Sequence, residues 1–432
     1  MKSLFFGGIH PDDKKELSAA ASSIKTVRPK QVSILMSQHI GIPCRPLVKA
    51  GDLVKKGQKV GDGEGLLVPV HASVSGKVIA VEPRRHPIGE NSMAVIIEND
   101  FQNTPDKTMA PCEDYSSLKP EAILSAIREA GIAGMGGAAF STKVKAASSM
   151  EKAEILIANG CECEPYLTAD DALLRTDAAK VLEGMRIISH VLKPKRMVLA
   201  VEENKQEAIK ALREAMAKER EIELKILPAR FPQGAEKQLI QAVTGREVPP
   251  GQLPVSVGCA VFNVATFAAI HDAIMLGLPV TERIVTVSGE GVKNPGNFRA
   301  PIGTSYEELL EAAGGLKEEA SRVITGGPMM GYAQEDLSVP VIKGTNGILG
   351  LTENVNPVDY ACIRCGKCLS VCPMKLEPLH LFEQVGLKNK KGMEHYYLMD
   401  CIECGCCSYT CPGKVPLTES FKKAKRILKE ES

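Results

Sequence analysis

The sequence contains no tryptophan, and aromatic residues make up only 4% of its 432 residues. Its charges nearly cancel, since the sequence has 53 lysine and arginine residues and 52 aspartate and glutamate residues. Proteins that bind nucleic acid need a basic surface, and those that bind single strands also need aromatic side chains on which bases stack. The composition therefore argues against nucleic acid as a partner.

A long uninterrupted apolar run is also missing. The longest apolar stretch, residues 255–280, is broken by Asn263, His271, Asp272 and Pro279, which a membrane-spanning helix would tolerate poorly. The first residues, MKSLFFGGIHPDD, reach glycine and aspartate too early for a secretory signal peptide. We therefore expect a soluble or peripheral protein of the reducing cytoplasm.

Cysteine is concentrated near the C-terminal end, where nine of the fourteen cysteines lie between residues 362 and 411. Eight of them form two runs with the spacing C-x2-C-x2-C-x3-C, each followed by proline. Such a run holds a [4Fe–4S] cluster in two-cluster ferredoxins, where the fourth cysteine of each run reaches the other cluster. We expect one cluster on Cys362, Cys365, Cys368 and Cys411, and a second on Cys401, Cys404, Cys407 and Cys372.

Two other uses of cysteine fit this spacing less well. Zinc sites usually pair cysteines across a longer spacer, and disulfide frameworks belong to small secreted domains. Cys406 stands outside both runs and is expected to be a spare thiol. Two clusters in one small domain would carry single electrons between other redox groups.

Residues 1–112 resemble the hammerhead domain of biotinyl and lipoyl carriers, a β-rich barrel. Short apolar runs alternate with turn residues, and Gly51 and Gly57 are placed for tight turns. No lysine occurs between Val60 and Gly76, where the carrier proteins need one on an exposed hairpin. The sequence therefore predicts this fold without the carrier chemistry.

Residues 113–281 alternate between helical and strand patterns. A helix is expected at 118–130, because Pro120 lies in its first turn and Gly131 follows it. Such alternation predicts a Rossmann-like α/β domain with a mostly parallel sheet. Buried strands are expected at 155–158, 197–201 and 224–227, with a helix at 204–218 between the last two.

The rest of the chain is expected to form two smaller parts. Residues 282–352 return to short strands around one helix near 305–313, which suggests a β-grasp-like module of the SLBB type. Residues 353–432 are expected to form an α-helical, two-cluster ferredoxin-like domain that begins with a linker at 354–357. The basic segment 421–429 is expected to be a solvated helix face. The whole chain is thus predicted to be multidomain, with α/β and α+β parts.

A second candidate site follows the helix at 118–130, where several glycines are clustered. Gly134, Gly136 and Gly137 precede a further helix, so their backbone N–H groups could approach a phosphate, and a nearby lysine adds positive charge. Glycine clusters also make ordinary turns. The cluster alone is therefore weak evidence for a ligand.

The strand at 155–158 ends in polar residues. Asn159, Glu162 and Glu164 place an amide and two carboxylates at the carboxyl end of a strand, where open α/β sheets bind ligands. The alternative is a loop with solvated acids. Cys161 and Cys163 are expected to be small buried groups, since two cysteines without a neighbouring histidine make a poor metal site.

Four segments carry a family resemblance: GMGGAAFSTKVK, NGCECEPYLTADD, FPQGAEKQL and FNVAT. They follow one another in the order seen in the flavin- and NADH-binding subunit of respiratory complex I. GGIHP stands near the start, a hammerhead-type region comes before these segments, and two ferredoxin-type runs come after them. Over its whole length the chain resembles the C-subunit family of the Rnf electron transport complexes.

The resemblance implies non-covalently bound FMN, two [4Fe–4S] clusters and NAD(H) as substrate, with no residue acting as acid, base or nucleophile. The sequence departs from the family pattern at Ala139, Ser141 and Ala265, where glycine, proline and an acid or glycine are usual. The cofactor-binding residues implied are Gly134, Gly136, Gly137 and Lys145 at the FMN phosphate, Asn159, Glu162, Asn263 and Thr266 around the flavin, Phe140, Glu164 and Glu236 towards the dinucleotide, and Gly234.

The chemistry of these groups is mutually consistent. NADH releases two electrons as a hydride, whereas each cluster takes one electron, and a flavin can exchange either number. The resemblance implies a subunit of an ion-translocating ferredoxin:NAD+ oxidoreductase. Such a subunit would lie on the inner face of the cell membrane through partner subunits, and would reach ferredoxin through the complex.

Two other functions are compatible with the motifs. A soluble reductase of the same superfamily, such as the cobalamin reductase of propanediol-utilising microcompartments or the partner of an amino-acid reductase, shares the flavin loop and the cluster runs. The hammerhead-type region ahead of the flavin segments favours the Rnf family over these. The second is a polyferredoxin adaptor whose α/β part binds no flavin.

Overall fold

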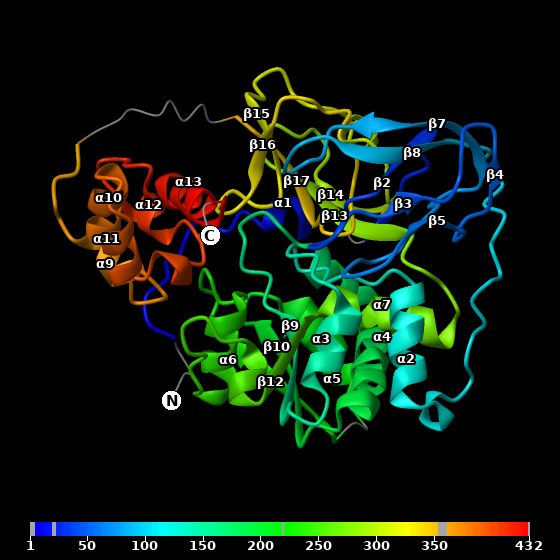
Figure 1. Ribbon diagram of the computed structural model, residues 1–432, viewed down its shortest axis with the longest axis horizontal. Helices are drawn as coiled ribbons and strands as arrows, with labels where there is room; N and C mark the ends of the chain where they lie inside the picture. The colour runs from blue at the N-terminus through cyan, green and yellow to red at the C-terminus, as the bar shows by residue number, and fades with distance from the viewer. Residues whose placement is uncertain (1–4, 20–22, 218–219, 353–360, 431–432) are drawn as a thin grey trace.

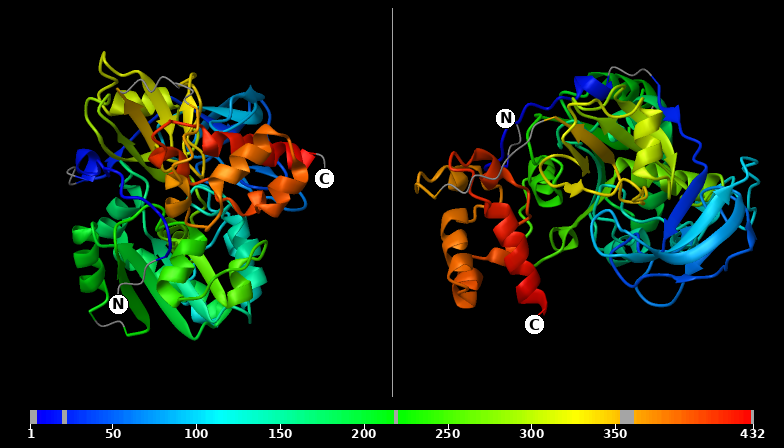
Figure 2. Two further views of the ribbon diagram at one scale, coloured as in Figure 1. Left: turned by 90° about the vertical axis from the view of Figure 1, so that its left-hand side faces the viewer. Right: turned by 90° about the horizontal axis from the view of Figure 1, so that it is seen from above.

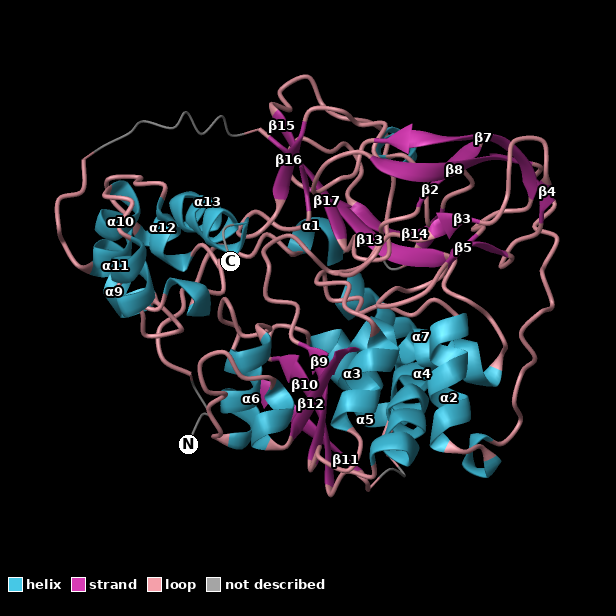
Figure 3. Cartoon of the chain, viewed as in Figure 1, coloured by secondary structure: helices cyan, strands magenta, loops and turns pink. Residues whose placement is uncertain are grey.

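The computed structural model describes residues 5–19, 23–217, 220–352 and 361–430, and the linker expected at 354–357 lies outside them. Figure 1 shows four parts: a strand-rich barrel in blue and cyan, an α/β body in green, a sheet in yellow and a helical domain in orange and red. Figure 3 shows strands gathered in the upper parts and helices packed around the lower sheet. The expected multidomain architecture is confirmed.

The N-terminal barrel consists of two small antiparallel sheets. Val32 and Ile34 are fully buried and belong to a core that continues without interruption into the α/β body. Gly51 and Gly57 have φ values of +99° and +90°, as their expected tight turns require. The strands are β2 (Gln31–Leu35), β8 (Ser92–Asn99), β7 (Gly76–Arg84) and β4 (Leu53–Val54) in one sheet, and β3 (Arg45–Pro46), β5 (Lys59–Asp62) and β6 (Val70–His71) in the other.

The sheet of the α/β body is wholly parallel, as expected, with the strand order β11-β10-β9-β12. Leu156 and Ala158 point into one apolar cluster, and Ile155 and Ile157 point into another on the opposite face. Because both faces are covered, the central strands β9 and β10 are mostly apolar and buried, whereas the edge strand β11 carries exposed residues. They are β9 (Ile155–Gly160), β10 (Arg196–Glu202), β11 (Ile222–Leu227) and β12 (Cys259–Asn263).

Five helices share the larger apolar cluster on one face of this sheet, and α6 covers the other face. Pro120 is the first residue of α2, and Gly131 beyond its end has a φ of +69°. The helix expected at 118–130 is therefore confirmed, with bounds at 120 and 129. The helices are α2 (Pro120–Glu129), α3 (Thr142–Ser149), α4 (Ala169–Leu192), α5 (Gln206–Ala215) and α7 (Val264–Met275), with α6 (Glu236–Thr244) opposite and short 3-10 turns at Tyr115–Ser117 and Pro254–Val257.

The third part is a six-stranded sheet with the order β1-β14-β13-β17-β15-β16 and helix α8 packed on it through Tyr306 and Leu309. Its edge strand β1 comes from the N-terminal segment and pairs in parallel with β14. The start of the expected 1–112 domain therefore extends out of the barrel. The elements are β1 (Lys25–Thr26), β13 (Glu282–Ser288), β14 (Gly296–Pro301), α8 (Tyr306–Ala312), β15 (Arg322–Thr325), β16 (Tyr332–Gln334) and β17 (Gly347–Leu351), with α1 (Glu16–Ala19) beside it.

The C-terminal domain is helical and has a small core of its own. Phe421 and Ala424 on α13 are buried in that core, which corrects the expectation that this segment is only a solvated helix face. Within the described ranges, no helix combines the length and apolar character needed to cross a membrane. The helices are α9 (Lys367–Val371), α10 (Pro378–Gly386), α11 (Lys390–His395), α12 (Cys406–Thr410) and α13 (Leu417–Glu430), with a 3-10 turn at Leu398–Asp400.

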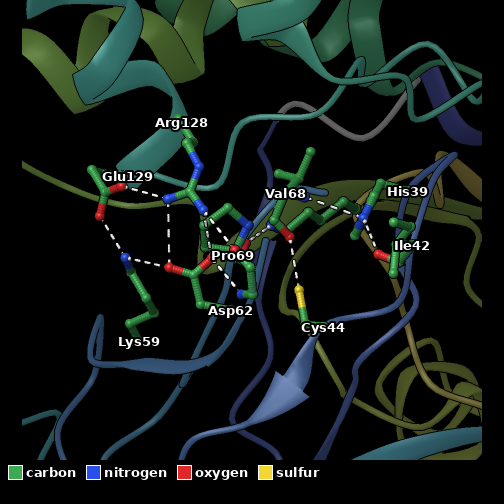
Figure 4. A network of polar contacts seen from close by, with 11 residues as sticks. His39, Ile42, Cys44, Lys59, Asp62, Val68, Pro69, Arg128 and Glu129 are labelled. Atoms are coloured by element: carbon green, nitrogen blue, oxygen red, sulfur yellow. Dashed lines mark hydrogen bonds and ion pairs between the residues drawn. The ribbon is translucent and has the colours of Figure 1, made fainter. Parts of the chain in front are cut away.

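The barrel is attached to α2 by a polar network at the hairpin where carriers would bear their lysine (Figure 4). Asp62 accepts from Lys59 Nζ at 2.9 Å and from Arg128 Nη2 at 2.8 Å. Glu129 closes the ring by accepting from Arg128 Nη1 at 2.6 Å and from Lys59 Nζ at 2.5 Å. The four charges balance, so the network fixes orientation at little net electrostatic cost.

Lys343 joins three parts of the chain at one buried point. Its ammonium donates to the carbonyl oxygen of Pro69 in the barrel at 2.5 Å and to that of Gly131 after α2 at 2.6 Å. The side chain is 1% exposed, and burial lowers the pKa of Lys343 to about 7. The barrel, the body and the third sheet are therefore held together beside the glycine-rich loop.

Replacement of Gly184 by alanine is predicted to destabilise the α/β body. Helix α4 passes so close to α7 that a Cβ on Gly184 would lie 2.0 Å from the carbonyl oxygen of Phe267. Overpacking of this kind costs about 1–3 kcal/mol or more, which thermal unfolding would report as a lower Tm. Gly386→Ala is the control, because no described atom lies within 4 Å of its Cβ position. An equal Tm for the two variants would contradict the packing described.

Candidate functional site

The carboxyl ends of the parallel strands form one edge of the α/β body, and most of the predicted site residues lie along it. Asn159 on β9 and Asn263 on β12 are partners in the strand register. Asn159 Nδ2 donates to the carbonyl oxygen of Gly234 at 2.9 Å, and its Oδ1 accepts from the N–H of Cys161 at 3.0 Å. Two strand ends and the loop at 231–234 therefore meet where open α/β sheets bind ligands.

The glycine-rich loop between α2 and α3 is fixed from both sides. The N–H of Gly134 donates to the carbonyl oxygen of the half-buried Phe140 at 2.7 Å, and that of Met135 donates to Thr266 Oγ1 at 3.0 Å. Gly137 has a φ of +103°, and a Cβ there would meet no described atom within 4 Å. The loop thus turns bare backbone towards open space before the N-terminus of α3, a cradle that suits a phosphate.

Gly136 in this loop lies against Asn263. A Cβ on Gly136 would be 3.3 Å from Asn263 Cβ, closer than most real contacts. Asn263 is held in turn, because its Nδ2 donates to Asp170 Oδ2 at 2.6 Å and its Oδ1 accepts from the N–H of Ala265 at 2.8 Å. A larger residue at position 136 would therefore displace both the loop and the residue that caps α7.

Three buried charged side chains support the loop and its neighbours. Asp170 donates its N–H to Glu162 Oε1 at 3.0 Å, and Arg283 Nη2 donates to the carbonyl oxygen of Met135 at 2.9 Å. Burial, together with the nearby charge of Glu162, raises the pKa of Asp170 to about 7. Burial lowers the pKa of Arg283 to about 10. The sequence analysis did not predict either Arg283 or Asp170 as a site residue. No motif contains Arg283, and Asp170 was noted only as part of the segment NGCECEPYLTADD.

Lys145 and Glu236, which were expected on two different ligands, form an ion pair with each other. Their side chains are 29% and 40% exposed, and Lys145 Nζ lies 5.4 Å from the centroid of the Phe262 ring. A phosphate at Lys145 would therefore compete with Glu236. The phosphate side and the dinucleotide side of the expected site meet at this pair.

Glu164, expected to face the dinucleotide, is covered by the loop at 326–331 of the third sheet. Its Oε2 accepts from the N–H of Met329 at 3.1 Å, and a Cβ on Gly327 would lie 2.2 Å from that oxygen. Burial raises the pKa of Glu164 to about 7. In this arrangement the carboxyl group lies at a junction between parts of the chain and is not open to a dinucleotide.

Gly234 packs directly on the loop that follows β9. A Cβ there would lie 2.1 Å from the carbonyl oxygen of Cys161, and its N–H donates to Cys163 Sγ at 3.3 Å. Burial raises the pKa of both thiols, so they stay protonated. Cys161 lies in an apolar cluster, as expected of a small buried group, whereas Cys163 also holds the loop at 231–234 in place.

Several buried polar atoms at this edge have no hydrogen-bond partner among the described residues. They are Glu202 Oε2 at the end of β10, Lys205 Nζ just beyond it, and both polar side-chain atoms of Gln233. Buried polar groups are almost always satisfied by protein, water or ligand. Together with the bare cradle at Gly137, these atoms fit an edge shaped for a polar ligand such as a flavin nucleotide.

The eight cysteines of the two runs fall into two sets of neighbours. Burial raises the pKa of Cys368, and Cys362, Cys411 and Cys365 raise it further by their proximity. The structure thus brings together the last cysteine of one run and the first three of the other. In the second set, burial raises the pKa of Cys407 to about 12 with contributions from Cys401, Cys404 and Cys372.

The second set surrounds a small cavity that Thr418 and Phe421 of α13 help to line. Within the described ranges, no three or more histidine, cysteine, aspartate or glutamate side chains are arranged to hold a single metal ion. A [4Fe–4S] group needs four cysteines spread around it, which is the chemistry of this donor set. Cys406 is fully buried beside the second set, and Cys362 and Cys365 of the first set are exposed.

The second set packs directly on the strand-end loops of the α/β body. Cys404 and Cys406 share an apolar cluster with Ile9 and Phe231, against which Cys163 is packed. A further contact comes from Gln238 on α6, whose Nε2 donates to the carbonyl oxygen of Pro373 at 3.2 Å. The edge that fits a flavin and the second set of thiols are therefore neighbours.

Models of four protein families match consecutive parts of the chain. The RnfC barrel sandwich hybrid domain matches residues 3–102, the Nuo51 FMN-binding domain 127–272, the SLBB domain 284–333 and the 4Fe-4S dicluster domain 361–415. A crystal structure of an NAD+-reducing [NiFe]-hydrogenase in the air-oxidized state has a similar fold, with a TM-score of 0.50 and 21% identity over 72% of this chain and 61% of that one.

Two relatives match this chain over most of its length. The chain is 44% identical to the C-subunit of the Na(+)-translocating ferredoxin:NAD(+) oxidoreductase complex of Acetobacterium woodii, over 88% of this chain and 86% of the relative. It is 42% identical to the C-subunit of the proton-translocating ferredoxin:NAD(+) oxidoreductase complex of Clostridium ljungdahlii, over 92% and 88%. The chain therefore belongs to the RnfC family, the C-subunits of ion-translocating ferredoxin:NAD(+) oxidoreductase complexes.

Proposed function

We propose that the chain is the subunit of an ion-translocating ferredoxin:NAD(+) oxidoreductase that passes electrons between NAD(H), FMN and two [4Fe–4S] clusters. The observation that carries this proposal is the packing of Cys404 and Cys406 on Phe231 and Cys163, which joins the candidate flavin edge to the second thiol set. The matched FMN-binding and dicluster domains support it. The names of the two relatives differ in the ion translocated, so family membership leaves the ion open.

In this proposal the residues of the edge bind and orient, and none of them exchanges a proton with the substrate. The loop at 134–137 and Lys145 hold the FMN phosphate, and Thr266 keeps that loop in position through its bond to Met135. Asn159 and Asn263 lie around the flavin, where Asn159 holds the loop at 231–234 through Gly234. When bound, FMN supplies the exchange between the two electrons of a hydride and the single electrons of the clusters. The loop at 326–331 covers Glu164 and helps to exclude water.

The two clusters are proposed to act in sequence. Cys372, Cys401, Cys404 and Cys407 hold the cluster nearer the flavin, because Cys404 packs on the α/β body. The other set faces outward through the exposed Cys362 and Cys365, beside Ile363, which is 69% exposed. This outward cluster is proposed to exchange electrons with a partner subunit, through which the complex reaches ferredoxin.

We also propose that the chain lies on the inner face of the cell membrane by binding partner subunits. Its relatives are named as subunits of ion-translocating complexes, and ion translocation requires a membrane. Partner subunits would supply the ion path. The family match to the RnfC barrel sandwich hybrid domain at residues 3–102 supports this proposal over the soluble reductases that share the later motifs.

NADH is predicted to reduce both kinds of group in the anaerobically prepared protein. Flavin absorbance should bleach first and cluster absorbance second, because only the flavin can accept the hydride. Stopped-flow spectra after mixing with NADH would resolve the two phases. A protein that carries both clusters but releases no flavin on acid precipitation would contradict the proposal and favour the adaptor function.

Cys407→Ser is predicted to lose one cluster and Cys406→Ser to keep both. Two cubanes contain about eight iron and eight acid-labile sulfide per chain, so the first variant should hold about four of each. Iron and sulfide analysis of the anaerobic protein is the measurement. Zinc in place of iron, or equal losses in the two variants, would refute the assignment of ligands.

Gly136→Val is predicted to abolish FMN binding and to leave the clusters in place. The new side chain would press on Asn263, which lies only 3.3 Å from the Cβ position. Lys145→Ala should weaken FMN binding by about tenfold to a hundredfold, the value of one charged hydrogen bond of ~1.5–3 kcal/mol. Flavin content and FMN titration measure both effects. Full flavin content in Gly136→Val would contradict this assignment and show that the flavin binds in another part of the chain.

A further inference from the structure

The first described residues form an arm that passes between the cluster domain and the α/β body. Figure 1 shows this blue segment running from the N-terminus past the orange and green parts towards α1, and the turned views of Figure 2 agree. On the cluster side, the N–H of Gly8 donates to the carbonyl oxygen of Val371 at 2.8 Å. A Cβ on Gly7 would lie 2.7 Å from the carbonyl carbon and oxygen of Cys372.

The other side of the arm is bonded to the loop at the flavin edge. Ile9 and Phe231 exchange two backbone hydrogen bonds, of 2.8 Å from the N–H of Ile9 and 3.0 Å from that of Phe231. Arg230 Nη1 donates to the carbonyl oxygen of Phe5 at 3.3 Å, and the guanidinium lies 5.1 Å from the centroid of the Phe5 ring. Phe5 is 2% exposed, so the start of the arm is anchored in the body.

The arm continues along the loop that follows β9. The buried ammonium of Lys15 donates to the carbonyl oxygens of Glu164 at 2.7 Å and Leu167 at 2.6 Å. Ser18 Oγ donates to the carbonyl oxygen of Tyr166 at 3.1 Å. The bond to Leu167 is buried and the other two are partly buried, so the arm is built into the edge of the site.

We propose that residues 5–9 are a positioning element that holds the second cluster at a fixed distance from the flavin. The arm contacts Cys372, an expected ligand of that cluster, and Phe231, in the loop that bonds to Asn159 through Gly234. One short extended segment thus touches both redox sites through its backbone. This inference rests on the proposed function for its electron-transfer consequence, and on the contacts alone for its structural part.

The arm would control the rate of one step, the transfer of one electron from the reduced flavin to the oxidised second cluster. The flavin is the reductant and the cluster the oxidant, and no covalent bond forms or breaks in the step. Two such transfers remove the electrons that one NADH supplies as hydride. Movement of Cys372 away from the body would slow this step and leave hydride transfer from NADH unchanged.

Two variants of the full chain test the proposal from opposite ends of the arm. Gly7→Ala forces the arm away from the carbonyl group of Cys372, and Phe5→Ala loosens it from the body without touching the cluster domain. Gly89→Ala is the control, since no described atom lies within 4 Å of its Cβ position. Iron and FMN contents should equal those of the wild type, with about eight iron per chain.

In stopped flow with NADH, both arm variants should reduce their flavin at the wild-type rate. Their clusters should bleach several-fold more slowly, because the rate of electron transfer falls as the distance between the flavin and the cluster grows. Hydrogen exchange at the amides of Gly8, Ile9 and Phe231 should be faster in Phe5→Ala than in the control. This second measurement needs no electron transfer.

The possible results distinguish a failure of the proposed role of the arm from a failure of the proposed function. Unchanged cluster bleaching in both variants would overturn the proposal, and so would a fall to about four iron in both, because the arm would then serve cluster assembly. If NADH fails to reduce the flavin of the wild type, the proposed function fails. Faster exchange at Phe231 in Phe5→Ala would then still support the arm as a clamp, and equal exchange would refute it.

Discussion

Close approach of backbone to backbone holds the two candidate redox sites against each other, and the rest of the structure depends on it. Gly234 lies on Cys161 and Gly7 lies on Cys372 at distances that leave no room for a side chain. Gly405, between two expected ligands of the second cluster, approaches the carbonyl oxygen of Met329 in the same way, with its Cβ position 3.0 Å away. Contacts between backbones do not change with rotamers, so they set distances more firmly than side-chain packing could. A chain whose two redox groups belong to different domains needs such a constraint.

Buried charge is concentrated at the same edge, where it is costly. Lys15, Glu162, Asp170 and Arg283 are all largely withdrawn from water, and each shows either hydrogen bonds to backbone or a neighbour of opposite charge. A buried charge is costly unless it is hydrogen-bonded. The bonds of Lys15, Glu162 and Arg283 to backbone groups hold the loops at 162–171 and 134–137 in place, so that binding of a ligand need not order these loops.

Features that depend on residues close together in the sequence, such as helix ends and cysteine spacing, could be predicted from the sequence. Contacts between residues that are far apart in the sequence could not. Helix α2 was predictable because Pro120 and Gly131 mark its two ends, and the parallel sheet because helical and strand patterns alternate along the chain. Cysteine spacing grouped the thiols into the same two sets that the structure brings together. The ion pair of Lys145 with Glu236 and the cover over Glu164 join segments far apart in the sequence, and no local pattern announces them.

The N-terminal arm, residues 5–9, was not predicted for the same reason, because its contacts are with residues far away in the sequence. Its contact with the cluster domain matters because that domain is small. That domain has a small apolar core in which Leu381, Leu398 and Phe421 pack beside the cysteines themselves. Small metal-binding domains gain part of their folding free energy from the metal group, because its ligands are not preformed in the unfolded chain. Contacts between this domain and the rest of the chain are made by segments that carry expected ligands, at Cys404 and at residues 371–372. The contacts of Gly7 and Gly8 with residues 371–372 therefore fix the position of the second thiol set through the backbone beside Cys372 itself.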